Sequence, residues 1–138
     1  MRFVDRNTVA RPKFLDSPRF EEVRRILAEI HDTATGGKRM KQRIVSFDEM
    51  FEPFRDEAIE MLRAVFNDKC AYTESPSMPE LPLAFHLHRP GGDAMGFDGS
   101  VDPEHYWWLQ TEWHNWMLVS PQIDSLKGTN FPVSGRFR

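Results

Sequence analysis

The sequence has one cysteine and no long apolar run. Cys70 alone has no partner for an intramolecular disulfide, and it supplies one thiolate where a structural zinc site needs four ligands. No stretch approaches the roughly 18 consecutive apolar residues that cross a bilayer. Residues 1–6 (MRFVDR) are interrupted by charge, unlike a signal peptide. These absences predict a cytoplasmic protein without a membrane partner, stabilised by neither a disulfide nor a cysteine-rich zinc site.

Positive charge is also scarce, because 18 Lys and Arg stand against 21 Asp and Glu, for a net charge of -3. Nonspecific affinity for nucleic acid comes largely from neutralising phosphates, so the balance argues against a general polyanion binder. A local cluster remains as a candidate contact, with the alternative that it is a solvated charge run. The candidate nucleic-acid-binding residues are Lys38, Arg39, Lys41, Arg43, Arg89 and Lys127.

Two common catalytic signatures are missing. No serine lies in a Gly-x-Ser-x-Gly elbow, and the Gly91-Gly92 pair lacks the Lys-Ser/Thr that completes a phosphate-binding loop. The sequence therefore gives little support to a serine hydrolase or a P-loop nucleotidase.

The content that is present indicates one small domain. A chain of 138 residues with 40% hydrophobic and 12% aromatic side chains has material for one core. Ser17 followed by Pro18 is typical of a helix start, and the apolar residues from Phe20 to Ile30 recur at helical spacing. The pattern predicts a helix over about residues 18–31.

A second, longer helix is predicted after Ser46. Ser46 and Glu49 form a capping box, and an apolar stripe follows through Val65, with Pro53 early enough in the helix to be tolerated. Ordinary amphipathic packing accounts for this stripe, so we assign it no chemistry.

The second half of the chain is predicted to contain shorter elements joined by turns. Residues 83–88 predict a short strand, residues 91–99 a turn-rich connection, and residues 121–127 a short helix. Between them, four tryptophans are expected to form one wall of the core, namely Trp107, Trp108, Trp113 and Trp116. We expect an α+β fold, with an N-terminal helical part over residues 1–69 and a smaller element over residues 70–138, together forming one compact domain.

The order of motifs in the second half resembles a known nuclease family. The segments concerned are 69–74 (KCAYTE), 85–90 (FHLHRP), 98–109 (DGSVDPEHYWWL), 112–115 (EWHN) and 127–133 (KGTNFPV). Together with residues 1–6 and the two helices, they resemble the HNH endonucleases that accompany an ATPase in bacterial antiphage systems of the Septu and retron type. The resemblance covers nearly the whole chain, and family members typically continue beyond residue 133.

The resemblance implies chemistry on a phosphodiester bond. In such nucleases a ββα-metal element holds a divalent ion that stabilises charge on the leaving oxygen, while a histidine activates water and an asparagine orients that histidine. Two Cys-x-x-Cys pairs hold a structural zinc ion. The family also implies an ATPase or another defence protein as a partner, and DNA as a substrate.

This sequence departs from the family at the zinc ligands. Thr73 replaces the second cysteine, and Ser120 and Ile123 replace the second pair. Three of the four thiolates are therefore missing, so we expect the zinc ion to be absent and Ile123 to fill part of its volume with hydrocarbon.

The catalytic strand departs as well. His86 takes the family's acidic position, Leu87 takes that of the water-activating histidine, and His88 takes that of the following aromatic residue. Leucine cannot move a proton. Strand alternation predicts His86 and His88 on one face and Leu87 on the other, so a neighbouring histidine substitutes only if a bulge or register slip re-aims it.

Two hypotheses follow. In the first, the chain is a degenerate HNH-like module, an α+β element without its zinc, that binds a defence partner or nucleic acid without cutting. In the second, it is an active, zinc-independent nuclease with a rearranged site. Its catalytic residues would then be His86, His88 and Asn115, and His86 and Asp124, with His88 or His114 as alternative imidazoles, would hold one Mg²⁺ or Mn²⁺ ion. The missing base at position 87 and the low positive charge favour the first.

Overall fold

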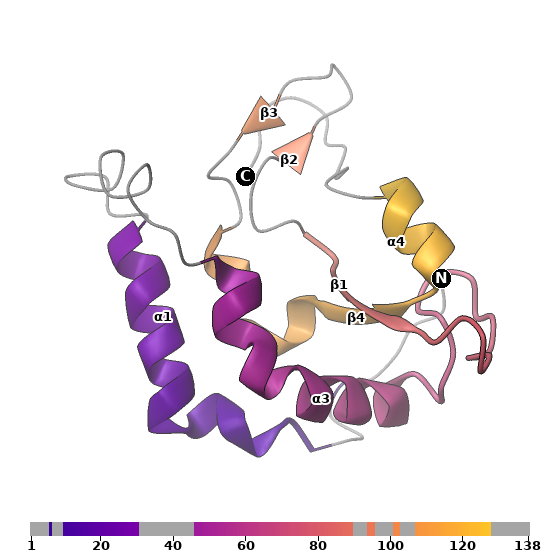
Figure 1. The fold of residues 1–138 in the computed structure, drawn as a ribbon, viewed down its shortest axis with the longest axis horizontal. Coiled ribbons are helices and arrows are strands. Elements are labelled where there is room, and N and C mark those ends of the chain that lie inside the picture. The colour runs from indigo at the N-terminus through magenta and orange to yellow at the C-terminus, as the bar shows by residue number, and fades with distance from the viewer. Residues whose placement is uncertain are drawn as a thin grey trace.

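The fold combines helices with short antiparallel strands. The computed structural model describes residues 6, 10–30, 46–89, 94–95, 101–102 and 107–127. Its elements are η2 (Lys13–Asp16), α1 (Pro18–Ile30), α3 (Phe47–Val65), β1 (Ala84–Leu87), β2 (Ala94–Met95), β3 (Val101–Asp102), η3 (Trp107–Leu109), η4 (Trp113–Asn115), β4 (Trp116–Val119) and α4 (Pro121–Lys127) (Figure 1). The expected α+β class is confirmed.

Helix α1 begins where the sequence predicts. The Ser17 hydroxyl accepts a hydrogen bond from the Phe20 main-chain N–H at 3.2 Å, and Pro18 occupies the first helical position. Phe20, Val23 and Leu27, spaced by three and four residues, are buried. The predicted helix is confirmed, because its amphipathic stripe has a core to cover.

Helix α3 is the longest of the described elements, and one of its faces packs against the main core. Its N-cap is Ser46, whose hydroxyl accepts from the Glu49 N–H at 3.3 Å. The helix includes Pro53 and ends before Asn67 and Asp68, whose positive φ angles of 53° and 58° leave the right-handed helical region. The buried residues along it are Phe47, Phe51, Phe54, Ala58, Leu62 and Val65.

Strands β1 and β4 pair antiparallel, and α4 follows β4 directly and contacts β1 (Figure 1). The predicted strand over 83–88 is thus confirmed in a shorter form, Ala84–Leu87. In the pairing of β1 with β4, Leu87 lies opposite Trp116 and Ala84 lies opposite Val119. The strand pair is covered by helices on both faces: α3 contacts both strands on one face, and α4 contacts β1 on the other.

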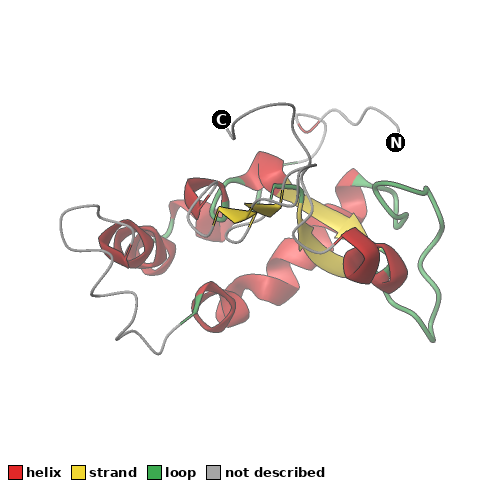
Figure 2. Cartoon of the chain, turned by 90° about the horizontal axis from the view of Figure 1, so that it is seen from above, coloured by secondary structure: helices red, strands yellow, loops and turns green. Residues whose placement is uncertain are grey.

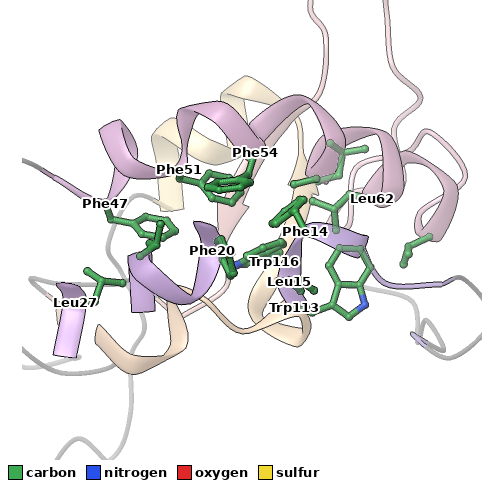
Figure 3. Close-up of a cluster of buried hydrophobic side chains, with 14 residues drawn as sticks. Phe14, Leu15, Phe20, Leu27, Phe47, Phe51, Phe54, Leu62, Trp113 and Trp116 are labelled. Atoms are coloured by element: carbon green, nitrogen blue, oxygen red, sulfur yellow. The ribbon is translucent and has the colours of Figure 1, made fainter. Parts of the chain in front are cut away.

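The main core lies between α1, α3 and the strand pair (Figure 3). At its centre is Trp116, which is 0% exposed. The rings that surround its indole are Phe14, Phe20, Phe51, Phe85 and Trp113, with centroids 5.2 to 6.2 Å away. Because this core draws side chains from both halves of the chain, the halves fold around a shared interior; the boundary at residues 69 and 70 stays a prediction.

A second, smaller cluster lies on the opposite face of β4. Met117 and Val119 point to it, whereas Trp116 and Leu118 point to the main core, as strand alternation requires. Its other buried members are Cys70 and Ala71. The loop that carries Cys70 and leads from α3 to β1 is mostly exposed beyond residue 72 and extends away from the helices in Figure 2.

The expected tryptophan wall is only partly correct. Trp113 and Trp116 are buried and Trp107 packs at the edge of the core, but Trp108 is 45% exposed. The prediction was wrong for Trp108 because the short η3 turn directs successive side chains in different directions. Among the helices in the described ranges, none has the length and apolar character that a membrane crossing needs.

Candidate functional site

His86 and Asp124 meet at the junction of β1 and α4. Phe85 and Leu87 pack against the main core, so the alternating strand places His86 on the opposite face. His86 is 6% exposed, and its Nδ1 lies 2.7 Å from Oδ1 of Asp124. The predicted opposition of His86 and Leu87 is confirmed, and residues 38 positions apart form a close pair.

The His86 ring is neutral at physiological pH. Burial lowers its pKa, and the hydrogen bond with Asp124 offsets this only in part. A neutral ring that donates from Nδ1 to the carboxylate carries its lone pair on Nε2. That nitrogen is buried and has no hydrogen-bond partner among the residues that the structure describes. The pair is therefore an imidazole oriented by a carboxylate, with its acceptor nitrogen enclosed.

His88 is held by Tyr72. The Tyr72 hydroxyl lies 2.6 Å from Nδ1 of His88. Burial raises the pKa of Tyr72 to about 12, so its hydroxyl keeps its proton and donates to the ring. Burial, followed by the charges of Lys127, Arg89 and His86, lowers the pKa of His88 to about 4. His88 is therefore a neutral ring fixed by a tyrosine.

The Asn115 side chain binds the main chain that follows β1. Its Oδ1 accepts from the Arg89 N–H at 2.8 Å, and its Nδ2 donates to the main-chain oxygens of Arg89 and Leu109 at 3.0 and 3.2 Å. These bonds position main chain, and they tie the end of β1 to η3. The role of Asn115 toward a histidine stays a prediction.

Lys127, the last residue of α4, contacts the main chain of His88. Its Nζ donates to the main-chain oxygen of His88 at 2.6 Å, and burial lowers its pKa. Arg89 lies two residues beyond the end of β1. The other candidate nucleic-acid contacts, Lys38, Arg39, Lys41 and Arg43, lie outside the described residues.

A cleft of about 610 Å³ opens beside this group. The described residues that line it are His88, Arg89, Trp108, Leu109, Glu112, His114 and Asn115. Sequence reasoning assigned Trp108 to the core and gave Glu112 no role. The signal that it missed is the pairing of an aromatic residue with charged residues on adjacent short turns.

The four positions that the sequence resemblance aligns with zinc ligands lie beside the second cluster. The Cys70 sulfur lies within hydrogen-bonding reach of the Thr73 hydroxyl and of the Ser120 main chain, and Ile123 packs against the cluster that contains Cys70. Burial raises the pKa of the Cys70 thiol, but these hydrogen bonds outweigh it, and the pKa lies below its ordinary value. One thiolate, two hydroxyls and one hydrocarbon do not form the set of thiolate and imidazole ligands that a structural zinc ion needs, and Ile123 packs against the cluster that contains Cys70.

The expected divalent ion would have few ligands at this site. Within the part of the chain that the structure describes, no three His, Cys, Asp or Glu side chains come together. His86 and Asp124 form a pair whose imidazole and carboxylate chemistry suits Mn²⁺. His114 lines the cleft instead.

Comparison with known proteins gives one informative similarity. Over 97 residues the chain is 33% identical to the Septu protein PtuA of Bacillus mycoides strain KBAB4. The match covers 64% of this chain, and the chain spans 14% of the length of that protein. No family model matches the chain, and no solved structure does. The similarity supports the Septu association that the motifs imply.

The lowered pKa of the partly buried His88 predicts that stability depends on pH. In the unfolded chain His88 takes up a proton near pH 6.5, whereas in the folded chain it does so only near pH 4. The contribution of His88 to the free energy of unfolding is therefore fully present above pH 6.5, and it is lost as the pH falls toward 4. The loss expected from His88 is roughly 2–3 kcal/mol. Urea unfolding at pH 7 and pH 4.5 measures it.

The matched variant is His88→Asn, whose oxygen accepts from Tyr72 without titrating. Its stability should fall clearly less over the same interval, with a residual slope from His86, whose pKa is also lowered by burial. Equal slopes for the two proteins would show that His88 is not the group responsible.

Proposed function

We propose that this chain is a binding module of a bacterial Septu-type antiphage defence system, built on an HNH-like ββα element that does not cut nucleic acid. The similarity to PtuA supports the defence context. The succession of two antiparallel strands and a helix, with four former ligand positions gathered beside it, supports the HNH-like element.

The position of Leu87 carries the proposal. It stands where the family has its water-activating histidine, and its side chain packs against the main core. His86 and Asp124 lie on the other face of the strand. The position that should activate water therefore has neither a titratable group nor access to the acidic residue of α4.

The neighbouring histidines do not readily replace that base. His88 accepts a hydrogen bond from Tyr72 at Nδ1, and the acceptor nitrogen of His86 is buried. A general base needs its acceptor within reach of the water that it deprotonates. Neither ring is presented in that way without a rearrangement of the site.

The alternative is an active, metal-dependent HNH DNA endonuclease with a zinc-independent site. The observation that favours it is the His86 and Asp124 pair, together with the Nε2 of His86, which has no hydrogen-bond partner within the described part of the chain. If a divalent ion binds, His86 and Asp124 would hold it, and it would supply charge stabilisation for the leaving oxygen.

As a binding module, the chain would act on a partner ATPase or another defence protein, or on nucleic acid. Arg89 lines the cleft and Lys127 contacts the His88 main chain, and Lys38, Arg39, Lys41 and Arg43 would add to these two basic contacts.

A cleavage assay tests the proposal. Purified protein with Mg²⁺ or Mn²⁺ is expected to leave supercoiled plasmid and phage DNA intact, because no base is placed to activate water. The His88→Ala and His86→Ala variants serve as controls against a contaminating nuclease. Nicking by the natural sequence that either substitution abolishes would overturn the proposal in favour of the endonuclease.

Calorimetry separates the two functions independently. The endonuclease requires Mn²⁺ binding at millimolar concentration that Asp124→Asn weakens, whereas the binding module requires none. Asp124→Asn keeps the size and an accepting oxygen for His86, so it changes the charge of the site with little change in packing.

A further inference from the structure

The cleft beside β1 combines an exposed aromatic face with charged groups of both signs. Trp108 is 45% exposed, in contrast to the buried Trp113 and Trp116. Arg89, Glu112 and His114 line the same cleft. A cleft lined by an aromatic side chain together with a few charged and polar groups has the character of a ligand site.

The main chain around the cleft is held by partly buried hydrogen bonds. The Asn115 side chain joins Arg89 at the end of β1 to Leu109 in η3. The Glu112 N–H donates to the Leu109 main-chain oxygen at 3.2 Å, and the Asn115 N–H donates to the main-chain oxygen of Glu112 at 3.0 Å. The main chain that carries the lining residues is thus held in place before any ligand arrives, which lowers the entropic cost of binding.

The chemistry of the lining residues suits a nucleotide. An indole face stacks on any nucleobase, a guanidinium pairs with phosphate, and a carboxylate accepts hydrogen bonds from an exocyclic amino group. The volume of about 610 Å³ lies within the range of roughly 300–1,000 Å³ that is usual for small-molecule sites.

We infer that this cleft binds an unpaired nucleobase with its attached phosphate, the base against Trp108, the phosphate at Arg89 and the base edge at Glu112. The inference rests on the proposed binding function and names its ligand. A base inside a duplex cannot stack on Trp108, so the cleft selects single strands or free nucleotides.

The low positive charge of the chain fits this ligand better than a polyanion track. With one phosphate at Arg89, the logarithm of the binding constant should fall with the logarithm of salt concentration by a slope of only about -0.7. Stacking, which depends little on salt, should supply most of the affinity.

Fluorescence anisotropy with labelled ten-nucleotide strands tests the inference on the intact chain. Oligo-dC should bind more tightly than oligo-dT, because cytosine has an exocyclic amino group for Glu112 and thymine has none. A duplex of the same length should bind weakly. Competition by dCMP separates the sources: full competition at similar concentration indicates a mononucleotide site, and weak competition indicates a strand.

The decisive variant is Trp108→Ala, which should weaken oligo-dC binding roughly 10- to 100-fold. Trp108→Phe should retain most of the binding, and Glu112→Gln should reduce the preference for oligo-dC over oligo-dT. The matched control is Leu126→Ala, which removes a 76% exposed apolar side chain that does not line the cleft and should leave binding unchanged.

The outcomes are distinct. Equal affinity of the natural protein and of a folded Trp108→Ala variant, or no binding to any strand, would overturn the inference. Cleavage of the labelled strands in Mg²⁺ would instead overturn the proposed non-cutting function, whatever the role of Trp108.

Discussion

The triple variant Thr73→Cys, Ser120→Cys and Ile123→Cys is expected to bind one Zn²⁺ ion per chain and to become markedly more stable with zinc than without it. Structural zinc sites with four thiolates have apparent binding free energies of about 10–16 kcal/mol near pH 7. Part of that free energy stabilises the folded chain, because the unfolded chain lacks the assembled site.

The expectation follows from where the four side chains lie. Cys70 is 1% exposed, and the Thr73 hydroxyl and the Ser120 main chain already reach its sulfur. Ile123 packs against the same cluster, one turn into α4. The Glu74 N–H donates to the Cys70 main-chain oxygen at 2.9 Å, which keeps the first loop tightly turned. Three new sulfurs would therefore join a loop and a helix start that are already adjacent.

The measurement is metal content by mass spectrometry, with thermal unfolding before and after chelation. Without zinc the variant should be less stable than the natural protein by about 1–2 kcal/mol, since Ile123 loses buried hydrocarbon. Thr73→Cys alone is the control and should bind no stoichiometric zinc, because it offers only two thiolates. A triple variant that folds but takes up no zinc would contradict the ligand correspondence drawn from the sequence.

The helices were predictable from the sequence because their signals are local. Ser17 with Pro18, and Ser46 with Glu49, mark the starts, and apolar residues three and four apart mark the buried faces. The structure adds the partners of those faces. Strand β4 was not located in advance, since its residues, Trp116–Val119, are all buried and show no alternation of polar and apolar side chains.

The candidate site was predictable where a strand rule applied, and unpredictable where distant turns meet. Alternation along β1 correctly separated His86 from Leu87, and the motif order made Asp124 a candidate neighbour of His86. The cleft needed tertiary structure, because it joins the end of β1 to η3 and η4. Tyr72 as the partner of His88 likewise depends on a contact between residues 16 positions apart that no local pattern signals.

Trp116→Ala is expected to lower the free energy of unfolding by about 3–5 kcal/mol, the range for removing a large aromatic side chain from a packed core. Trp116 is 0% exposed, and its indole packs against aromatic rings on η2, α1 and α3 (Figure 3). It also packs against the Phe85 ring of β1. Its Nε1 also donates to the Gln110 main-chain oxygen at 2.8 Å. The substitution therefore opens a cavity where the helical part meets the strand pair.

Urea unfolding followed by circular dichroism measures the loss, with Trp108→Ala as the matched control. Both variants delete an indole, but Trp108 is 45% exposed, so its removal should cost about 1 kcal/mol or less. If Trp116→Ala leaves too little folded protein to measure, Trp116→Phe should show an intermediate loss, since it keeps most of the ring volume and deletes the hydrogen bond to Gln110. Similar losses for the two alanine variants would mean that the core is not organised around Trp116.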